Sequence, residues 1–202
     1  MPLWIAPHPL VLASKSDIRG KLLAASGLRF GIRAAQIDER AVERDGHVSD
    51  AQAAARLLAK AKAKAVSAQM PGHIVLGADQ TLARGTARMT KPVNREEAAA
   101  QLRTLRGRTH ELHSGVALVR DGEVLFDMVD TARLTMRDFS DRFLDDYLEM
   151  TGDVALTSIG AYQLEGIGIH LFDRVEGDYF TILGLPMLPL LKYLRDSGYV
   201  DG

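Results

Sequence analysis

Apolar positions near the start of the chain predict a strand, a polar loop and a helix. Residues 10–13 form a short apolar run of the kind found in buried strands. After a polar stretch, Ile18, Leu22 and Leu23 follow at helical spacing, and Gly27 is expected to end that helix. The chain is therefore expected to open on a buried strand that leads through a polar loop into a helix.

The same alternation continues toward the middle of the chain. Residues 51–69 are rich in alanine, which has the highest helix propensity, and Gly72 follows them. Residues 74–76 begin a second buried strand, which we expect to reach its carboxyl end in residues 77–80.

The second half of the chain predicts strands beside helices. Residues 110–119 and 124–136 are expected to form two antiparallel strands joined by a turn. Glycines punctuate residues 161–177, which we expect to be strand-like, and residues 84–90 are expected to be a flexible loop. Helices are expected at residues 96–105, 141–150 and 186–197.

This order of elements predicts an α/β fold. Strands alternate with helices early and a hairpin lies in the middle, so the sheet should be mixed and not purely parallel. The chain has 202 residues, of which 47% are apolar, so it is long enough for a real core. We expect residues 1–202 to form a single domain, either simple or with two lobes.

Charge and cysteine content narrow the partners. The formal net charge is −1, whereas proteins that bind the phosphate backbone of nucleic acids are usually clearly basic. We therefore expect no nucleic-acid partner, and any polyanion should be small and bound at one site. There are no cysteines, which excludes disulfides and thiolate metal sites and fits a reducing compartment.

The sequence also predicts a cytoplasmic protein with no membrane partner. No apolar run reaches the roughly 20 residues needed to cross a bilayer. The basic head of a signal peptide is missing, because the first charged residue is Lys15.

The first candidate for chemistry is the polar loop before the first helix. Ser14, Lys15, Ser16 and Arg19 supply hydroxyls and positive charge where backbone N–H groups at a helix start are free to bind phosphate. The loop lacks the glycines of a Walker motif. Ordinary capping of the helix by Ser16 is the alternative interpretation.

Two acidic positions are candidates for metal or proton chemistry. Asp79 lies at the expected carboxyl end of a strand, where ligands often bind in α/β sheets, and it could hold a divalent metal or deprotonate a water. Glu39, beside Asp38, could supply the second carboxylate for Mg²⁺. The alternatives are a turn aspartate and an acidic turn at the surface.

Two lysines and one glycine-rich segment complete the candidates. Lys62 falls on the apolar stripe of the alanine-rich helix, so it is an inward cation that needs a partner. Lys91 precedes a helix and could meet phosphate, although an exposed lysine is the ordinary interpretation. Residues 160–166 could approach a flat base closely, or form a bulged strand.

Taken together, these segments resemble the Maf family of nucleotide pyrophosphatases, in the right order and nearly from end to end. The segment Leu12–Arg19 is similar to the family's opening phosphate motif. The further matching segments are 38–39, 58–63, 77–79, 91–92, 105–110, 114–116, 160–162, 176–177 and 184–186.

The resemblance implies a fold and a set of roles. The fold would be like that of inosine triphosphate pyrophosphatase, with a mixed, curved sheet, flanking helices, two lobes and a central cleft. Asp79 would be the catalytic base and, with Glu39, a ligand of Mg²⁺ or Mn²⁺. The triphosphate would be held by Ser14, Arg19, Lys62 and Lys91. Lys15 would replace a positive charge that the family's phosphate loop usually has and that this loop lacks. Members are usually cytoplasmic and often dimeric, which leaves a homodimer open.

The sequence departs from the family pattern at Asp17 and Ile18, where proline and arginine are usual, and at Ser158, where lysine is usual. Gln80 and Glu165 are further predicted substrate contacts, and the sequence around Glu165 resembles the branch that acts on 7-methyl-GTP. A carboxylate suits guanine, because it accepts hydrogen bonds from the N1–H and the N2 amine of the base.

The activity implied is hydrolysis of a nucleoside triphosphate to the monophosphate and pyrophosphate, as a house-cleaning enzyme for non-standard nucleotides. The rival from another class is a non-catalytic, nucleotide-binding regulator of cell division and septum formation. The carboxylate pair argues against that rival, because binding alone does not need carboxylates beside phosphate.

Overall fold

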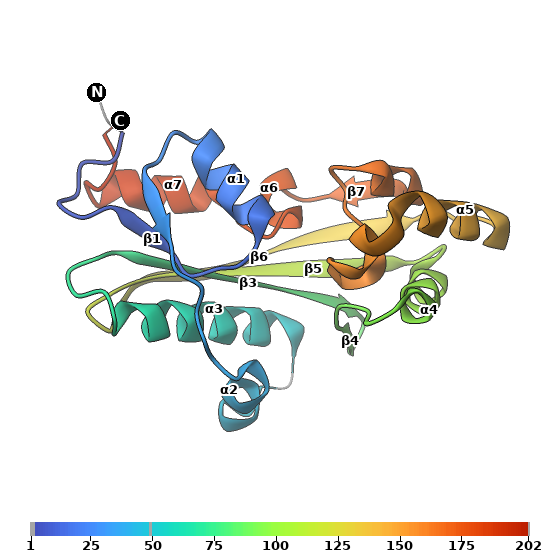
Figure 1. The fold of residues 1–202 in the computed structure, drawn as a ribbon, viewed down its shortest axis with the longest axis horizontal. Coiled ribbons are helices and arrows are strands. Elements are labelled where there is room, and N and C mark those ends of the chain that lie inside the picture. The colour runs from blue at the N-terminus through green and yellow to red at the C-terminus, as the bar shows by residue number, and fades with distance from the viewer. Residues whose placement is uncertain (1–2, 49, 202) are drawn as a thin grey trace. The chain divides into compact units, whose positions relative to one another are not determined.

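The computed structural model describes residues 3–48 and 50–201. Within them a seven-stranded sheet runs in the order β2-β1-β3-β5-β6-β7, with β4 paired to β3 (Figure 1). The strands are β1 (Leu10–Leu12), β2 (Phe30–Ile32), β3 (Val75–Arg84), β4 (Ala87–Met89), β5 (Thr109–Arg120), β6 (Glu123–Met136) and β7 (Phe172–Glu176).

The sheet is mixed, as predicted. β1 lies parallel to both β2 and β3, whereas β4 is antiparallel to β3 and β7 is antiparallel to β6. Between β5 and β6 only Asp121 and Gly122 intervene, with φ angles of 50° and 84°. Two-residue connections of this kind join antiparallel strands and need positive φ at both positions.

Helices flank the sheet. The α-helices are α1 (Asp17–Ala25), α2 (Glu39–Asp45), α3 (Ala51–Ser67), α4 (Arg95–Leu105), α5 (Asp141–Thr151), α6 (Tyr179–Ile182) and α7 (Met187–Asp196), and the 3₁₀ helices are η1 (Gly152–Leu156), η2 (Ile159–Ala161) and η3 (Ile167–Leu171). No helix among the described residues is long and apolar enough to span a membrane.

The chain divides into two compact units, in keeping with the predicted two lobes. The first contains the described residues of Met1–Gln80, His113–Asp130 and Tyr179–Gly202, and the second contains Thr81–Leu112 and Thr131–Asp178. Three strands, β3, β5 and β6, contribute residues to both units. The central cleft and the single-domain assignment stay predictions.

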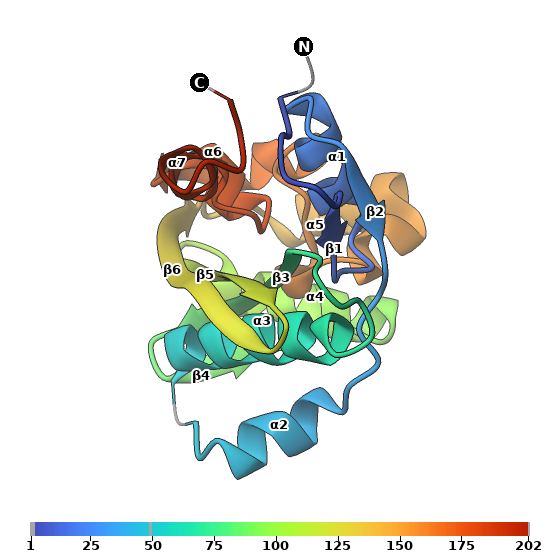
Figure 2. The same cartoon turned by 90° about the vertical axis from the view of Figure 1, so that its left-hand side faces the viewer.

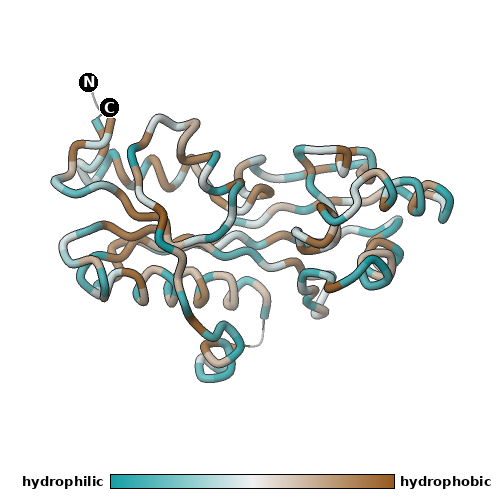
Figure 3. The backbone as a smooth tube through the Cα atoms, in the orientation of Figure 1, coloured by the Kyte–Doolittle hydropathy of each residue, from teal (hydrophilic) through white to brown (hydrophobic). Residues whose placement is uncertain are grey.

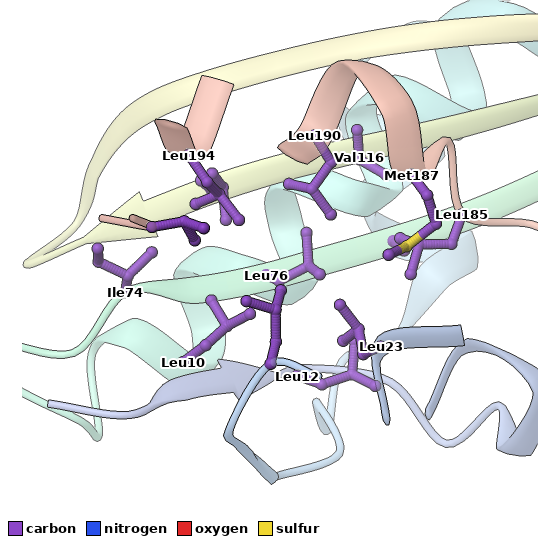
Figure 4. Close-up of a cluster of buried hydrophobic side chains, with 14 of the residues drawn as sticks. Leu10, Leu12, Leu23, Ile74, Leu76, Val116, Leu185, Met187, Leu190 and Leu194 are labelled. Atoms are coloured by element: carbon purple, nitrogen blue, oxygen red, sulfur yellow. The ribbon is translucent and has the colours of Figure 1, made fainter. Parts of the chain in front are cut away.

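The core of the first unit has two apolar layers, one on each side of its strands. Side chains alternate between the two faces of a strand. Leu76 therefore joins the cluster of leucines and methionine from α1 and α7, whereas its neighbour Val75 packs with Ala59 and Ala63 of α3 (Figures 2 and 4).

The helix α3 lies very close to the sheet because two strand positions have no side chain. A Cβ built on Gly77 would stand 2.1 Å from the carbonyl oxygen of Ala59, and one on Gly115 would stand 2.3 Å from that of Ala55. Real Cβ atoms do not approach oxygen so closely. The backbone of α3 therefore occupies the space that side chains would need.

The second unit contains an aromatic cluster. His110 Nε2 and Tyr162 Oη are hydrogen-bonded at 2.7 Å, and the Tyr162 ring meets Phe172 edge-on at 4.9 Å between centroids. Nδ1 of His110 is buried without a hydrogen-bond partner among the described residues. Burial lowers the pKa of His110 from 6.5 to about 4.

Two sequence expectations were wrong. Residues 161–177 are mostly 3₁₀ helix and loop, and only Phe172–Glu176 forms a strand. Residues 84–90 are not a flexible loop, because they hold the turn and all of β4 in a hairpin with β3. The short helices α2 and α6 were not expected at all; α2 is mostly hydrophilic and has no buried residue, so it has no apolar stripe to reveal it (Figure 3).

We predict that Gly77→Ala destabilises the protein strongly, whereas Gly31→Ala does not. The added methyl group at Gly77 must push α3 away from β3, which should reduce the free energy of unfolding by at least about 2 kcal/mol. A Cβ at Gly31 meets nothing within 4 Å, so that variant should stay within about 1 kcal/mol of wild type. Urea unfolding followed by circular dichroism measures both, and equal stabilities would contradict the close approach.

We also predict that His110 makes the protein sensitive to acid. The folded-state pKa of about 4 lies below the ordinary 6.5, so the unfolded chain takes up a proton first as the pH falls. The stability is complete above pH 6.5 and decreases toward pH 4, by roughly 3 kcal/mol in total.

In the variant His110→Gln, the free energy of unfolding should no longer decrease in this way as the pH falls. Glutamine can form a hydrogen bond with Tyr162 but does not titrate in this range. The exposed His170→Gln is the matched control and should keep the wild-type pH profile. Unfolding free energies measured from pH 7 to pH 4 compare the slopes. Identical slopes for wild type and His110→Gln would show that another group is responsible.

Candidate functional site

Asp79 lies inside β3 and not at its carboxyl end, which corrects the sequence expectation. The neighbouring strand β1 ends at Leu12, level with Leu76, and β3 continues past that point without β1 on that side. The site therefore lies at the carboxyl end of β1, beside the longer β3. Asp79 itself is buried, with 8% of its surface exposed.

Arg19 occupies the space where β1 has ended. Its guanidinium donates hydrogen bonds to the carbonyl oxygen of Ala78 at 3.1 Å, to Ser14 Oγ at 3.2 Å and to the carbonyl oxygen of Gly184 at 2.8 Å. The carbonyl of Ala78 lies one residue before Asp79. Arg19 thus fixes the strand, the polar loop and the segment after α6 around the acidic residue.

The polar loop is ordered differently from an ordinary helix cap. Ser16 is the N-cap residue of α1, but its side chain makes no capping bond. Instead the backbone N–H of Ser16 donates to Ser14 Oγ at 3.2 Å. Lys15 is exposed beside them. The capping alternative therefore does not account for the hydroxyl of Ser16.

Lys62 joins the two predicted carboxylates. Its Nζ lies 2.5 Å from Asp79 Oδ1 and 2.8 Å from Glu39 Oε1. The three side chains come from α3, β3 and the first residue of α2. Asp38, which was considered with Glu39, instead caps α2 by accepting from the N–H of Ala41 at 3.0 Å. The inward lysine predicted from the apolar stripe thus has its partners.

Asp79 takes up a proton more readily than an exposed aspartate would. Burial raises the pKa of Asp79 above its ordinary value, and the positive charges of Lys62 and Arg19 oppose this rise. Burial also lowers the pKa of the Arg19 guanidinium, against the attraction of Asp79 and Glu39. Arginine remains charged in proteins nonetheless, so the site keeps two cations beside its acidic pair.

Gln80 points to the face opposite Asp79, as successive strand residues do. Its Nε2 donates to Ser114 Oγ at 3.0 Å and to the carbonyl oxygens of Thr181 and Ile182 at 3.1 and 2.9 Å. Ser114 Oγ in turn donates to the carbonyl oxygen of Thr181 at 2.7 Å. Sequence reasoning missed Thr181, because the short helix α6 gives no periodic signal.

The remaining predicted substrate contacts belong to the second unit. Lys91 and Glu165 are both exposed there, Lys91 before α4 and Glu165 between η2 and η3. Ser14, Lys15, Ser16, Arg19, Glu39, Lys62, Asp79 and Gln80 belong to the first unit. Within that unit the structure brings together Ser14 with Arg19, and Lys62 with Glu39 and Asp79.

The donor set fits a divalent cation that is held partly by substrate. Among the described residues no group of three or more His, Cys, Asp or Glu side chains is arranged to hold a metal. Glu39 and Asp79 nevertheless converge on a single ammonium group. Mg²⁺ is usually bound by one or two carboxylates together with substrate phosphates, and these two oxygens suit that arrangement.

Comparisons with known proteins agree with one another. A family model described as Maf-like protein matches residues 9–197. A nucleoside triphosphate pyrophosphatase of Nitrobacter winogradskyi is 54% identical over 197 residues, which covers 98% of each chain. A 7-methyl-GTP pyrophosphatase of Rhizobium meliloti is 53% identical over 194 residues, which covers 95% of this chain and 98% of that one.

Among solved structures, a HAM1 protein from Coxiella burnetii aligns with 65% of this chain and 74% of its own. The sequence identity is 15% and the TM-score is 0.44, so nothing further rests on this similarity.

Proposed function

Because this chain belongs to the Maf family, we propose that it hydrolyses a nucleoside triphosphate to the monophosphate and pyrophosphate. It is a hydrolase, a nucleoside triphosphate pyrophosphatase like its relatives at more than 50% identity. The observation that carries the mechanism is the buried carboxylate of Asp79 held beside two cations, Lys62 and Arg19.

Asp79 is the proposed general base. It accepts the proton of a water that attacks the α-phosphorus, and the bond from that phosphorus to the bridging oxygen breaks as pyrophosphate leaves. A base works best when its pKa lies near the operating pH. The raised pKa of Asp79, which burial causes, moves the carboxylate in that direction.

The cations of the site act on the phosphates in this proposal. Lys62, Arg19 and Lys91, with Ser14, Lys15 and Ser16 of the polar loop, bind the triphosphate and stabilise the charge that grows on the leaving pyrophosphate. Glu39 and Asp79 would hold the divalent cation, Mg²⁺ or Mn²⁺. When bound, such a cation neutralises phosphate oxygens and orients the chain.

The substrate that we propose is a modified guanine nucleotide. Methylation at N7 gives the guanine ring a positive charge, and the exposed carboxylate of Glu165 would attract that charge while it accepts from the N1–H and the N2 amine. The relative from Rhizobium meliloti, named for 7-methyl-GTP, supports this choice. A cytoplasmic location and a homodimer remain parts of the proposal.

Pyrophosphate release tests the function. Purified protein is incubated with 7-methyl-GTP, GTP, dTTP, UTP or CTP and with Mg²⁺ or Mn²⁺, and both pyrophosphate and orthophosphate are measured. We expect metal-dependent release of pyrophosphate, and we expect Asp79→Asn to lower kcat at least about a hundredfold, because asparagine cannot take the proton.

Asn is isosteric with Asp, so circular dichroism should show a folded variant, with Glu39 left as the partner of Lys62. Near wild-type turnover by Asp79→Asn would reject the proposed base. Release of orthophosphate alone would mean a phosphohydrolase, and no release from folded protein with any nucleotide would favour the non-catalytic regulator of cell division.

Glu165→Gln tests the choice of base. Glutamine keeps the shape but loses the negative charge, so kcat/KM for 7-methyl-GTP should fall about tenfold or more, while the values for dTTP and UTP stay nearly constant. Glu149→Gln, an exposed substitution in the same unit, is the matched control. An unchanged order of preference among the bases would remove Glu165 from the base-binding site.

A further inference from the structure

Lys62 occupies the point at which a divalent cation would be expected. Its single ammonium group contacts Glu39 at 2.8 Å and Asp79 at 2.5 Å, and these are the two carboxylates assigned to the metal. A cation that used both oxygens would have to lie between them, where Nζ already lies. A metal held by both carboxylates would therefore compete with the ammonium group of Lys62.

We propose that Lys62 is a built-in counter-ion that closes the metal position until a nucleotide arrives. In the free protein its ammonium group satisfies Glu39 and Asp79, and on binding of the triphosphate it moves to the phosphates and releases the carboxylates. The inference rests on the proposed function and deepens it, because it makes metal binding depend on nucleotide binding.

The need for a counter-ion follows from burial. The side chain of Asp79 is 11% exposed and that of Lys62 is 14% exposed. A carboxylate removed from water in this way is unfavourable unless a positive charge compensates it. Without Lys62, the free protein would hold two facing carboxylates with no cation between them.

Lys62 is suited to exchange partners, and Arg19 is not. Its ammonium is a compact charge on a flexible stem, with donors that rotate freely. Arg19, by contrast, is held by acceptors from the polar loop, from β3 and from the segment after α6. Glu39 can also adjust, because α2 has no buried residue that fixes it.

Competition predicts weak metal binding by the free protein and tighter binding once the lysine charge is removed. A nucleotide that draws Lys62 away from the carboxylates must raise the affinity of the protein for the metal. The metal must then raise the affinity for the nucleotide by the same factor. The metal affinity of the free protein reports this without any catalysis.

The test is a titration with Mn²⁺ alone, followed by electron paramagnetic resonance of the free ion, at about pH 8 and without nucleotide. We expect Lys62→Met to bind Mn²⁺ at least about tenfold more tightly than wild type, because a like charge next to the metal has been removed. Lys62→Arg keeps the charge and should not gain affinity.

The control is Lys60→Met on the same helix, whose ammonium pairs with Asp127 at 3.3 Å and lies outside the site. It should bind Mn²⁺ as wild type does. Adding Asp79→Asn to Lys62→Met should abolish the gain, which would locate the bound ion. Circular dichroism checks folding, and Lys62→Gln serves as the second neutral variant if methionine is not tolerated.

Equal or weaker Mn²⁺ binding by the neutral Lys62 variants would overturn the proposal, and so would an equal gain by Lys60→Met. Because no nucleotide is present, this result is independent of the pyrophosphate assay. A protein that hydrolyses nucleotides without the gain would reject the counter-ion alone, and one that shows the gain without hydrolysis would reject the proposed function alone.

Discussion

The close contact between α3 and the sheet determines the arrangement of the candidate site. Gly77 has no side chain, so the backbone of α3 at Ala59 and Ala63 lies directly against β3. Gly77 and Asp79 are two residues apart and share that face of the strand. Lys62 is adjacent to Ala63, and it therefore reaches Asp79 without leaving its helix. A bulkier residue at Gly77 would move the cation away from the acid that it neutralises.

The electrostatics of the site follow from that packing. Burial alone would favour a neutral Asp79 and raises its pKa, while Lys62 and Arg19 restore part of the preference for the charged form. The two cations differ in how they are held. Arg19 bridges the polar loop, β3 and the segment after α6, whereas Lys62 pairs with the carboxylates of Glu39 and Asp79, which we propose it can exchange for phosphates. The buried acid Asp79 is thus influenced by two cations, of which Arg19 is held at several points and Lys62 is proposed to move.

Local periodicity made much of the fold predictable, because buried runs and alanine-rich helices carry their pattern in the sequence. The prediction failed where burial is not periodic. Residues 161–177 begin at the end of η2, where Ala161 has a φ of 61°, and continue through η3, so most of the segment is not a strand. The length of β3 was also missed, because Asp79 and Gln80 are polar residues inside a strand. The inward position of Lys62 was found from its stripe, but the identity of both partners needed the tertiary structure.

The pair Asp79 and Gln80 shows how one strand serves two purposes. Asp79 faces α3 and the charged groups, while Gln80 points the other way, where its Nε2 has three acceptors for its two hydrogens, two on α6 and one on β5. That nitrogen has no hydrogen left to donate to a ligand. Gln80 instead holds the carbonyls of Thr181 and Ile182, and Arg19 holds Gly184 two residues later. Gln80 and Arg19, which were both predicted to contact substrate, thus anchor the same short segment. We therefore expect a change at Gln80 to act on substrate through the position of that segment and of Arg19.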